Sequence, residues 1–177
     1  MTIENDIPLL DEILSKFSGS LGGELAAYRN HVYRMVNFCF AQTELSDDEK
    51  QMIVIAGCFH DLGIWTAGTF DYIPPSKALA IEYLNQSGDS SLAPQIERMI
   101  GEHHKLRHFE GDRLTEIFRR GDLADFSLGI VTNGIPRSYI SEVKARFPNA
   151  GFHKYLVRLA AGWICRHPLR PVPVLKW

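Results

Sequence analysis

Four side chains that are good metal ligands interrupt apolar stretches of this sequence, namely His31, His60, Asp61 and Asp122. His60 and Asp61 follow directly on the run "MIVIAGCF". A carboxylate that such a run carries into the protein interior costs several kcal/mol unless it meets a cation or hydrogen-bond donors. We therefore expect the pair to have a partner.

Two aspartates continue the apolar stripe of a later predicted helix. Asp122 lies four residues after Phe118, and Asp125 lies three residues further on, so both share a helical face with Phe118. Two acids on one buried face repel each other, and a cation would remove this conflict. Gly121 is poor for helix stability, but it would let a neighbouring helix or a ligand approach closely.

His31 also lies on the apolar face of a predicted helix, because it comes three residues after Tyr28 and four before Met35. If His31 converges with Asp122 and with His60 and Asp61, together called the HD pair, two imidazoles and two carboxylates could bind one divalent ion. This mixed nitrogen and oxygen set suits Mn, Fe, Co, Ni or Zn better than Mg or Ca. A buried network of His–Asp pairs without a metal explains the same residues, and both interpretations stay open on the residues alone.

Helices must position these side chains, because apolar residues recur at helical spacing nearly everywhere. The pattern predicts helices over residues 21–41, 46–63, 76–88, 91–104 and 112–128, and two more that begin near residues 136 and 150. Ser46 and Glu49 stand at capping-box spacing, Gly63 is expected to end that helix, and Ser76 is expected to cap the next. The only hairpin-like signal is "GIVTNGI". We predict an all-α fold.

The composition is that of a soluble globular domain, with 45% apolar and 23% charged residues among 177 and a formal net charge of −2. Without a basic field, no nucleic-acid polymer is expected as a partner. The stretch "MTIENDIPLL" is acidic where a secretory signal is basic, and no apolar run reaches the roughly 20 residues that span a bilayer, so we expect a cytoplasmic protein without membrane contact. Cys39, Cys58 and Cys165 are expected to be buried.

We expect one domain over residues 1–177, with a motif-bearing core at about 28–129 and C-terminal helices and an extended tail at 136–177. The order of His31, then His60 and Asp61 in "FHDLG", then Asp122 in "GDLADFSLG" resembles the HD-domain metal-dependent phosphohydrolase superfamily. The resemblance implies an HD-domain-like helical bundle that holds a metal between its helices, with these four residues as ligands. It leaves a choice between Asp122 and Asp125, of which we take Asp122 as the ligand.

The resemblance also implies hydrolysis of a phosphate monoester or nucleotide. A divalent ion lowers the pKa of bound water from about 15.7 to about 7 and offsets phosphate charge. In "GEHHKLRH", His103 or His104 could contact the phosphate or protonate the leaving oxygen, with Asp61 as a ligand that takes part in catalysis. Lys105 and Arg107 could hold phosphate oxygens.

Several roles stay open on the sequence. Arg34 could bind an anionic substrate or pair with Asp61 or Asp125. Residues 62–102 contain no histidine, which favours one metal over the two of oxygenase members of the family. A dinuclear iron oxygenase, with Asp71 as a further ligand, and a noncatalytic metal-binding regulatory module are the alternatives. A homodimer is plausible because symmetric dimers are the commonest oligomers.

Overall fold

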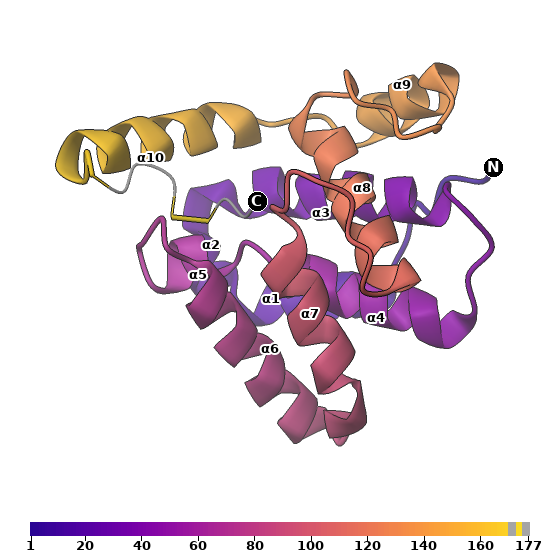
Figure 1. The fold of residues 1–177 in the computed structure, drawn as a ribbon, viewed down its shortest axis with the longest axis horizontal. Coiled ribbons are helices and arrows are strands. Elements are labelled where there is room, and N and C mark those ends of the chain that lie inside the picture. Colours follow the sequence, from indigo (N-terminus) through magenta and orange to yellow (C-terminus); the bar gives the residue numbers. More distant parts are fainter. Residues whose placement is uncertain (170–172, 175–177) are drawn as a thin grey trace.

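Helices make up the regular structure of the computed structural model, which describes residues 1–169 and 173–174 and contains no strand among them (Figure 1). The all-α prediction is confirmed. The helices are α1 Pro8–Lys16, α2 Ser18–Leu21, α3 Leu25–Phe40, α4 Asp47–Phe59, α5 Gly63–Thr66, α6 Ile73–Ser87, α7 Ala93–Glu102, α8 Arg113–Phe126, α9 Arg137–Arg146 and α10 Phe152–Arg166. Short 3₁₀ turns, Gly22–Glu24 and Ser90–Leu92, precede α3 and α7.

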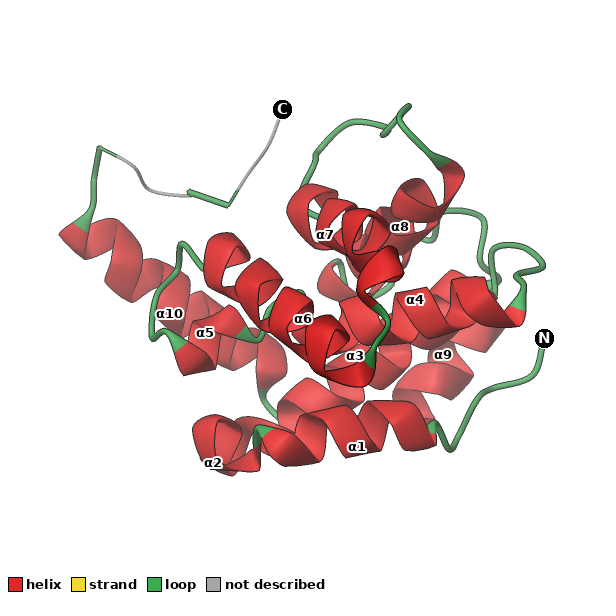
Figure 2. Cartoon of the chain, turned by 90° about the horizontal axis from the view of Figure 1, so that it is seen from below, coloured by secondary structure: helices red, strands yellow, loops and turns green. Residues whose placement is uncertain are grey.

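Helices α3, α4 and α8 form the centre of the bundle, with α1, α6 and α7 around them (Figures 1 and 2). The most extensive contact is that between α3 and α8. It is close because Gly121 faces α3: a Cβ on Gly121 would overlap the Sγ of Cys39 and lie 3.0 Å from the carbonyl oxygen of Met35. The expectation that Gly121 admits a neighbouring helix is confirmed, and this contact brings the acids of α8 to the histidine of α3.

Helix α4 begins as its capping signal predicts. The Glu49 N–H donates to Ser46 Oγ at 3.2 Å, and the Ser46 N–H donates to Glu49 Oε2 at 2.9 Å. The helix then becomes buried on all sides from Ile53 to Phe59. It ends at Phe59, with His60 as its C-cap, so the HD pair stands at the buried end of a central helix.

The prediction that Gly63 ends this helix is wrong. Gly63 begins the short helix α5, where the lack of a Cβ serves close packing: a Cβ would lie 2.5 Å from the carbonyl oxygen of Tyr72. The Gly63 N–H donates to Ser76 Oγ at 2.9 Å. Ser76 lies inside α6 and does not cap it. The helix already begins at Ile73, because the prolines that follow fit the first helical turn, where no backbone N–H is needed. Gly88 ends α6 in the left-handed conformation, as expected.

Other local predictions have mixed outcomes. Asp112 caps α8 by accepting from the Thr115 N–H at 2.8 Å, as expected. Helix α1 was not predicted. Cys39 and Cys58 are buried, as expected, but Cys165 is exposed. Cys165 lies near the end of α10, a helix in which only the first residue, Phe152, is buried. The predicted extended tail falls largely outside the described residues. No described helix has the length and apolar character needed to cross a membrane.

Candidate metal centre

The four predicted ligands converge from three helices of the bundle. His31 comes from the middle of α3, the HD pair from the end of α4, and Asp122 from α8. Their exposed fractions are 1% for His31, 0% for His60 and 4% for each aspartate. Side chains of these types are rarely buried so completely unless they are paired or bind an ion.

The distances among the ligand atoms suit a shared ion. The Nε2 atoms of His31 and His60 are 3.1 Å apart. Asp122 Oδ1 lies 3.6 Å from each of them, and Asp61 Oδ2 lies 3.4 Å from His60 Nε2 and 3.9 Å from His31 Nε2. Atoms that bind one ion at about 2.0–2.2 Å lie roughly 3.0–3.5 Å from one another, because the ligand angles are tetrahedral or octahedral. His31, His60 and Asp122 thus form a group that could hold a metal ion, and Asp61 belongs to an adjoining group with His60 and His103.

Contacts behind the imidazoles fix which nitrogen faces the group. His31 Nδ1 lies 2.7 Å from Asp125 Oδ2, and His60 Nδ1 lies 2.8 Å from the carbonyl oxygen of Gly57. Both partners only accept hydrogen bonds, so each Nδ1 carries the proton and donates it. In a neutral ring the Nε2 then presents a lone pair, so two Nε2 atoms 3.1 Å apart need either a metal ion between them or a proton on one of them.

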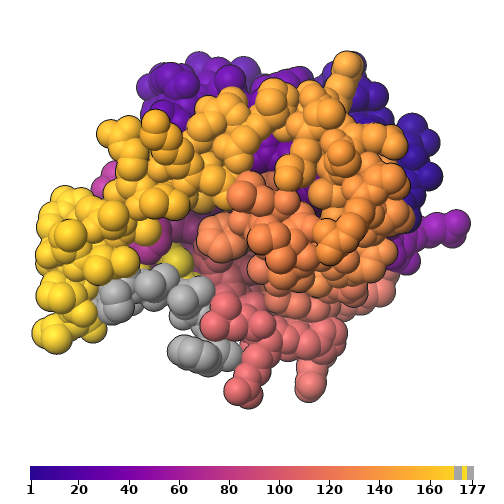
Figure 3. All heavy atoms as spheres, turned by 90° about the horizontal axis from the view of Figure 1, so that it is seen from above, coloured from indigo at the N-terminus to yellow at the C-terminus, as the bar shows by residue number. Residues whose placement is uncertain are grey.

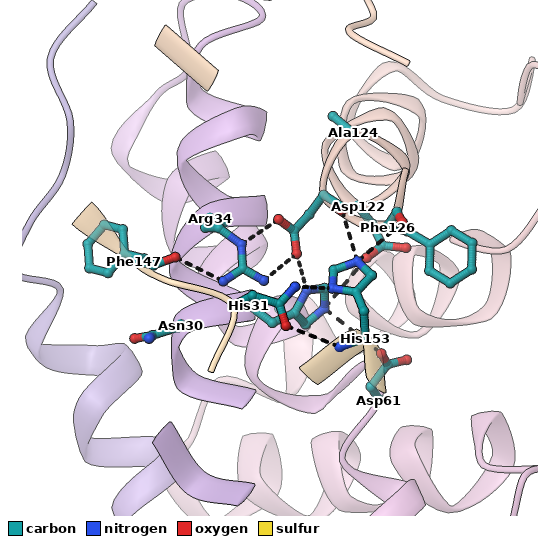
Figure 4. A network of polar contacts seen from close by, with 12 residues as sticks. Asn30, His31, Arg34, Asp61, Asp122, Ala124, Phe126, Phe147 and His153 are labelled. Atoms are coloured by element: carbon teal, nitrogen blue, oxygen red, sulfur yellow. Dashed lines mark hydrogen bonds and ion pairs between the residues drawn. The ribbon is translucent and has the colours of Figure 1, made fainter. Parts of the chain in front are cut away.

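Arg34 holds Asp125 in place behind His31. Its Nε and Nη2 donate to the two carboxylate oxygens at 2.5 and 2.8 Å, and its Nη1 donates to the carbonyl oxygen of Phe147 at 3.0 Å. Figure 4 shows Asp61 and Asp122 on the other side of the network from Arg34. Because its guanidinium is buried and committed to these partners, Arg34 takes the pairing role with Asp125 that the sequence allowed beside substrate binding, and it does not line the cavity described below.

The buried acids and imidazoles of this group shift one another's pKa values. Burial lowers the pKa of His60, but the charges of Asp61 and Asp122 outweigh this effect and raise the pKa to about 9. Burial raises the pKa of Asp61, but the imidazole of His60 reverses the effect and holds this pKa far below its usual range. Hydrogen bonds from His31 and Arg34 overcome the burial of Asp125 in the same way and keep its pKa low. Without a metal, the two acids thus keep a proton on His60.

Metal binding is expected to release this proton. At pH 7 the pKa of about 9 leaves His60 protonated, and its Nε2 can bind an ion only after deprotonation. Metal affinity should therefore rise by about tenfold per pH unit as the pH rises toward 9 and level off above it. Calorimetric titration of metal-free protein with Zn²⁺ at pH 7.0, in two buffers of different ionisation enthalpy, measures the protons released. Identical heats in both buffers would contradict the prediction.

Two buried atoms beside the group have no hydrogen-bond partner, Asp61 Oδ1 and His103 Nε2. They lie 3.5 Å apart. His103 follows α7 and its Nδ1 lies 2.8 Å from the carbonyl oxygen of Ile100, so its Nε2 is again directed away from the backbone and toward Asp61. The two atoms lie within ion-pair distance of each other, and neither has a hydrogen bond that would keep a water, an ion or a substrate atom from binding beside them.

A cavity of about 450 Å³ opens onto these atoms. It lies between α8, α10 and the segment that follows α7, and Figure 3 shows the surface hollowed between yellow α10 and the orange part of the chain. His31, Asp61, His103 and Asp122 are part of its wall. Among the described residues, this cavity thus connects the site to a space that fits a small molecule.

Of the residues predicted to contact the substrate in this segment, some line the cavity and one does not. His104 and Lys105 line the cavity, whereas Arg107 is exposed and lies outside its lining. His104 Nε2 is 2.5 Å from the hydroxyl of Tyr72, and burial and the adjacent His103 lower the pKa of His104 to about 3. His104 is therefore uncharged at neutral pH, so its predicted role as a proton donor to the leaving oxygen does not fit.

Sequence reasoning missed three residues of the site. Arg119 lines the cavity, forms two hydrogen bonds of 2.7 Å to Glu116, and donates to the carbonyl oxygen of Lys105 at 3.1 Å, which ties the histidine segment to α8. Phe152 stacks on His31 with ring centres 4.1 Å apart, and His153 lines the cavity. The spacing of Glu116 and Arg119, three residues apart in α8, was a sequence signal that could have identified Arg119. The sequence holds no such signal for Phe152 and His153, because their place in the site depends on where α10 packs.

Comparison with known proteins adds no family to this description. No family model, no curated protein and no solved structure matches the chain.

Proposed function

We propose that the protein is a metal-dependent phosphohydrolase of the HD type that acts on a phosphate monoester. The ion is a divalent transition metal held by His31, His60, Asp61 and Asp122. One observation carries the proposal: four buried ligand atoms at ion-sharing distances stand at the inner end of a cavity, beside an imidazole nitrogen without a partner. A metal-free network, in which a protonated His60 donates to His31 Nε2, is the alternative, and a protein that binds no metal would favour it.

A bound divalent ion supplies a water of lowered pKa and positive charge that offsets the phosphate. The residues of the chain then position the reactants. Asp61 has one oxygen directed to the ligand group and the other to His103, so it can hold the attacking water in line. The Nε2 of His103 is placed to contact the phosphoryl group or the leaving oxygen. Lys105 adds a positive charge to the cavity wall, and His104 accepts from Tyr72 and keeps the wall rigid.

His103→Gln is expected to lower phosphate release about 100- to 10,000-fold, because the variant cannot exchange a proton with the substrate. Its metal content should stay that of the wild type, because His103 is outside the proposed ligand set. The measurement is phosphate release from a panel of phosphorylated metabolites and nucleoside monophosphates, after loading with Mn²⁺, Fe²⁺, Co²⁺, Ni²⁺ or Zn²⁺. Arg107→Gln, in the same segment but outside the cavity lining, is the control and should keep wild-type activity.

A substrate panel that yields no turnover with a fully loaded wild type would contradict the proposal. The protein would then be a noncatalytic metal-binding module, provided that metal analysis shows the site to be filled. Loss of metal together with activity in His103→Gln would instead place His103 among the ligands.

A second candidate function has one observation in its favour. His103 Nε2 and Asp61 Oδ1 are both unpaired, and His60, Asp61 and His103 form a further group whose ligand atoms lie within 4.8 Å of one another. A second ion there would make the site dinuclear, as in the oxygenase alternative. Two irons per chain after anaerobic loading, together with oxygen consumption and no phosphate release, would favour it over hydrolysis.

A further inference from the structure

The cavity that leads to the proposed metal site has mostly apolar walls. Beyond the ligand group, the walls are formed by side chains such as Phe70, Leu123, Phe126, Leu156, Val157 and Ala160. Helices α8 and α10 and the segment between α5 and α6 supply these side chains. A cavity that only had to admit inorganic phosphate or a strongly charged metabolite would not need such walls.

The polar residues of the cavity gather near the metal group or are already paired. His103 and His104 have ring centres 4.0 Å apart, and Tyr72 contacts His104. The charge of Arg119 is offset by its two hydrogen bonds to Glu116. Lys105 remains, with its Nζ 5.2 Å from the ring centre of Phe109. Among the described lining residues, the positive charge thus suffices for one compact anionic group and falls short of that needed for a polyphosphate.

The mouth of the cavity is apolar too. Leu106, Phe126, Leu128 and Val157 all line it, with exposed fractions of 52%, 53%, 48% and 68%. Large apolar side chains that gather around one opening mark a surface that binds an apolar partner. Because this mouth continues into the cavity that ends at Asp61 and His103, its partner is the molecule that enters the site.

We infer that the substrate is an amphiphile with one compact acidic headgroup, a monophosphate, and an aliphatic or aromatic body. The headgroup lies at the metal group beside His103 and Lys105, and the body lies along the apolar faces of α8 and α10. The volume of about 450 Å³ is that of a small-molecule site, so the end of a longer chain emerges between the apolar residues of the mouth. The inference rests on the proposed function and narrows its substrate class.

A chain-length series tests the inference. With metal-loaded protein, kcat/KM for n-alkyl phosphates from ethyl to decyl should rise about fourfold per added methylene until the cavity is filled. Nucleoside monophosphates should be poorer substrates than octyl phosphate. Equal kcat/KM values across the alkyl series, or a tenfold preference for a nucleoside monophosphate, would overturn the inference while the proposed hydrolysis stands.

Two variants of α10 test where the apolar body of the substrate lies. Val157→Asp places a charge at the cavity mouth and should lower kcat/KM for decyl phosphate at least tenfold, with ethyl phosphate unchanged. Ile164→Asp, an exposed β-branched residue of the same helix outside the cavity lining, is the matched control and should leave the whole series unchanged. If both variants behave alike, the body does not lie against this face and the inference is wrong.

A binding measurement separates this inference from the reaction. Octylphosphonate cannot be hydrolysed as an ester, and it should bind the metal-loaded protein at least tenfold more tightly than ethylphosphonate in calorimetry. If this difference is found while no phosphate ester is hydrolysed, the apolar cavity is a ligand site and only the proposed reaction is wrong. Equal affinities would refute the inference whatever the reaction.

Discussion

Asp122→Asn is expected to lower phosphate release by more than about a thousandfold, because an amide is a weak metal ligand and the water of lowered pKa is lost with the ion. The fold should survive. The amide of Asn has the size of the Asp122 carboxylate and can still accept a hydrogen bond in the buried group, where Asp61 remains as the acid beside His60. The measurement is kcat/KM on the best substrate of the panel, together with the metal content.

The matched control is Asp48→Asn, the same change at an exposed position in the first turn of α4. It should leave both rate and metal content unchanged. An Asp122→Asn protein that keeps its metal and at least a tenth of the wild-type activity would show that α8 does not complete the site.

Arg34→Met is expected to destabilise the protein by about 3–5 kcal/mol, because it removes the charged partner of the buried Asp125 carboxylate, which keeps only its hydrogen bond from His31. The wild-type pair has exposed side-chain fractions of 2% for both partners, so solvent cannot take over the role of the guanidinium. The measurement is urea unfolding of the metal-free protein. Metal affinity should fall as well, by about 10- to 100-fold, because Asp125 orients His31.

Arg29 offers a comparison on the same helix. Its Nε and Nη2 donate to Asp11 at 2.6 and 2.8 Å, but this pair is partly exposed, at 36% and 37%. Arg29→Met should therefore cost no more than about 1 kcal/mol. Equal losses in the two variants would contradict the buried role of Arg34. The double variant Arg34→Met with Asp125→Leu should regain part of the stability, because no charge is then left unpaired.

Local signals in the sequence were enough to place the ligand group. Helical spacing puts His31 and Asp122 on buried faces, and the apolar run before His60 carries the HD pair into the core; the structure places both aspartates within 3.9 Å of the Nε2 atoms of His31 and His60. The close approach expected at Gly121 is confirmed. These inferences succeed because each depends on one helix and its periodicity.

Long-range packing explains what the sequence did not predict. Gly63 had the appearance of a helix end, but its role is set by Tyr72 on the next helix. Arg34 could have served a substrate until the position of Asp125 and the backbone of Phe147 was known. The apolar cavity is formed between α8 and α10, and no periodicity within either helix predicts that the two face each other.

We propose that one ion is held in common by side chains from α3, α4 and α8. The decisive measurement is elemental analysis of protein purified without chelator, beside Asp61→Ala prepared in the same way. We expect about one equivalent of a transition metal in the wild type and none in the variant. A wild type that stays metal-free after incubation with Mn²⁺, Fe²⁺, Co²⁺, Ni²⁺ and Zn²⁺, or a variant that retains as much metal as the wild type, would contradict it.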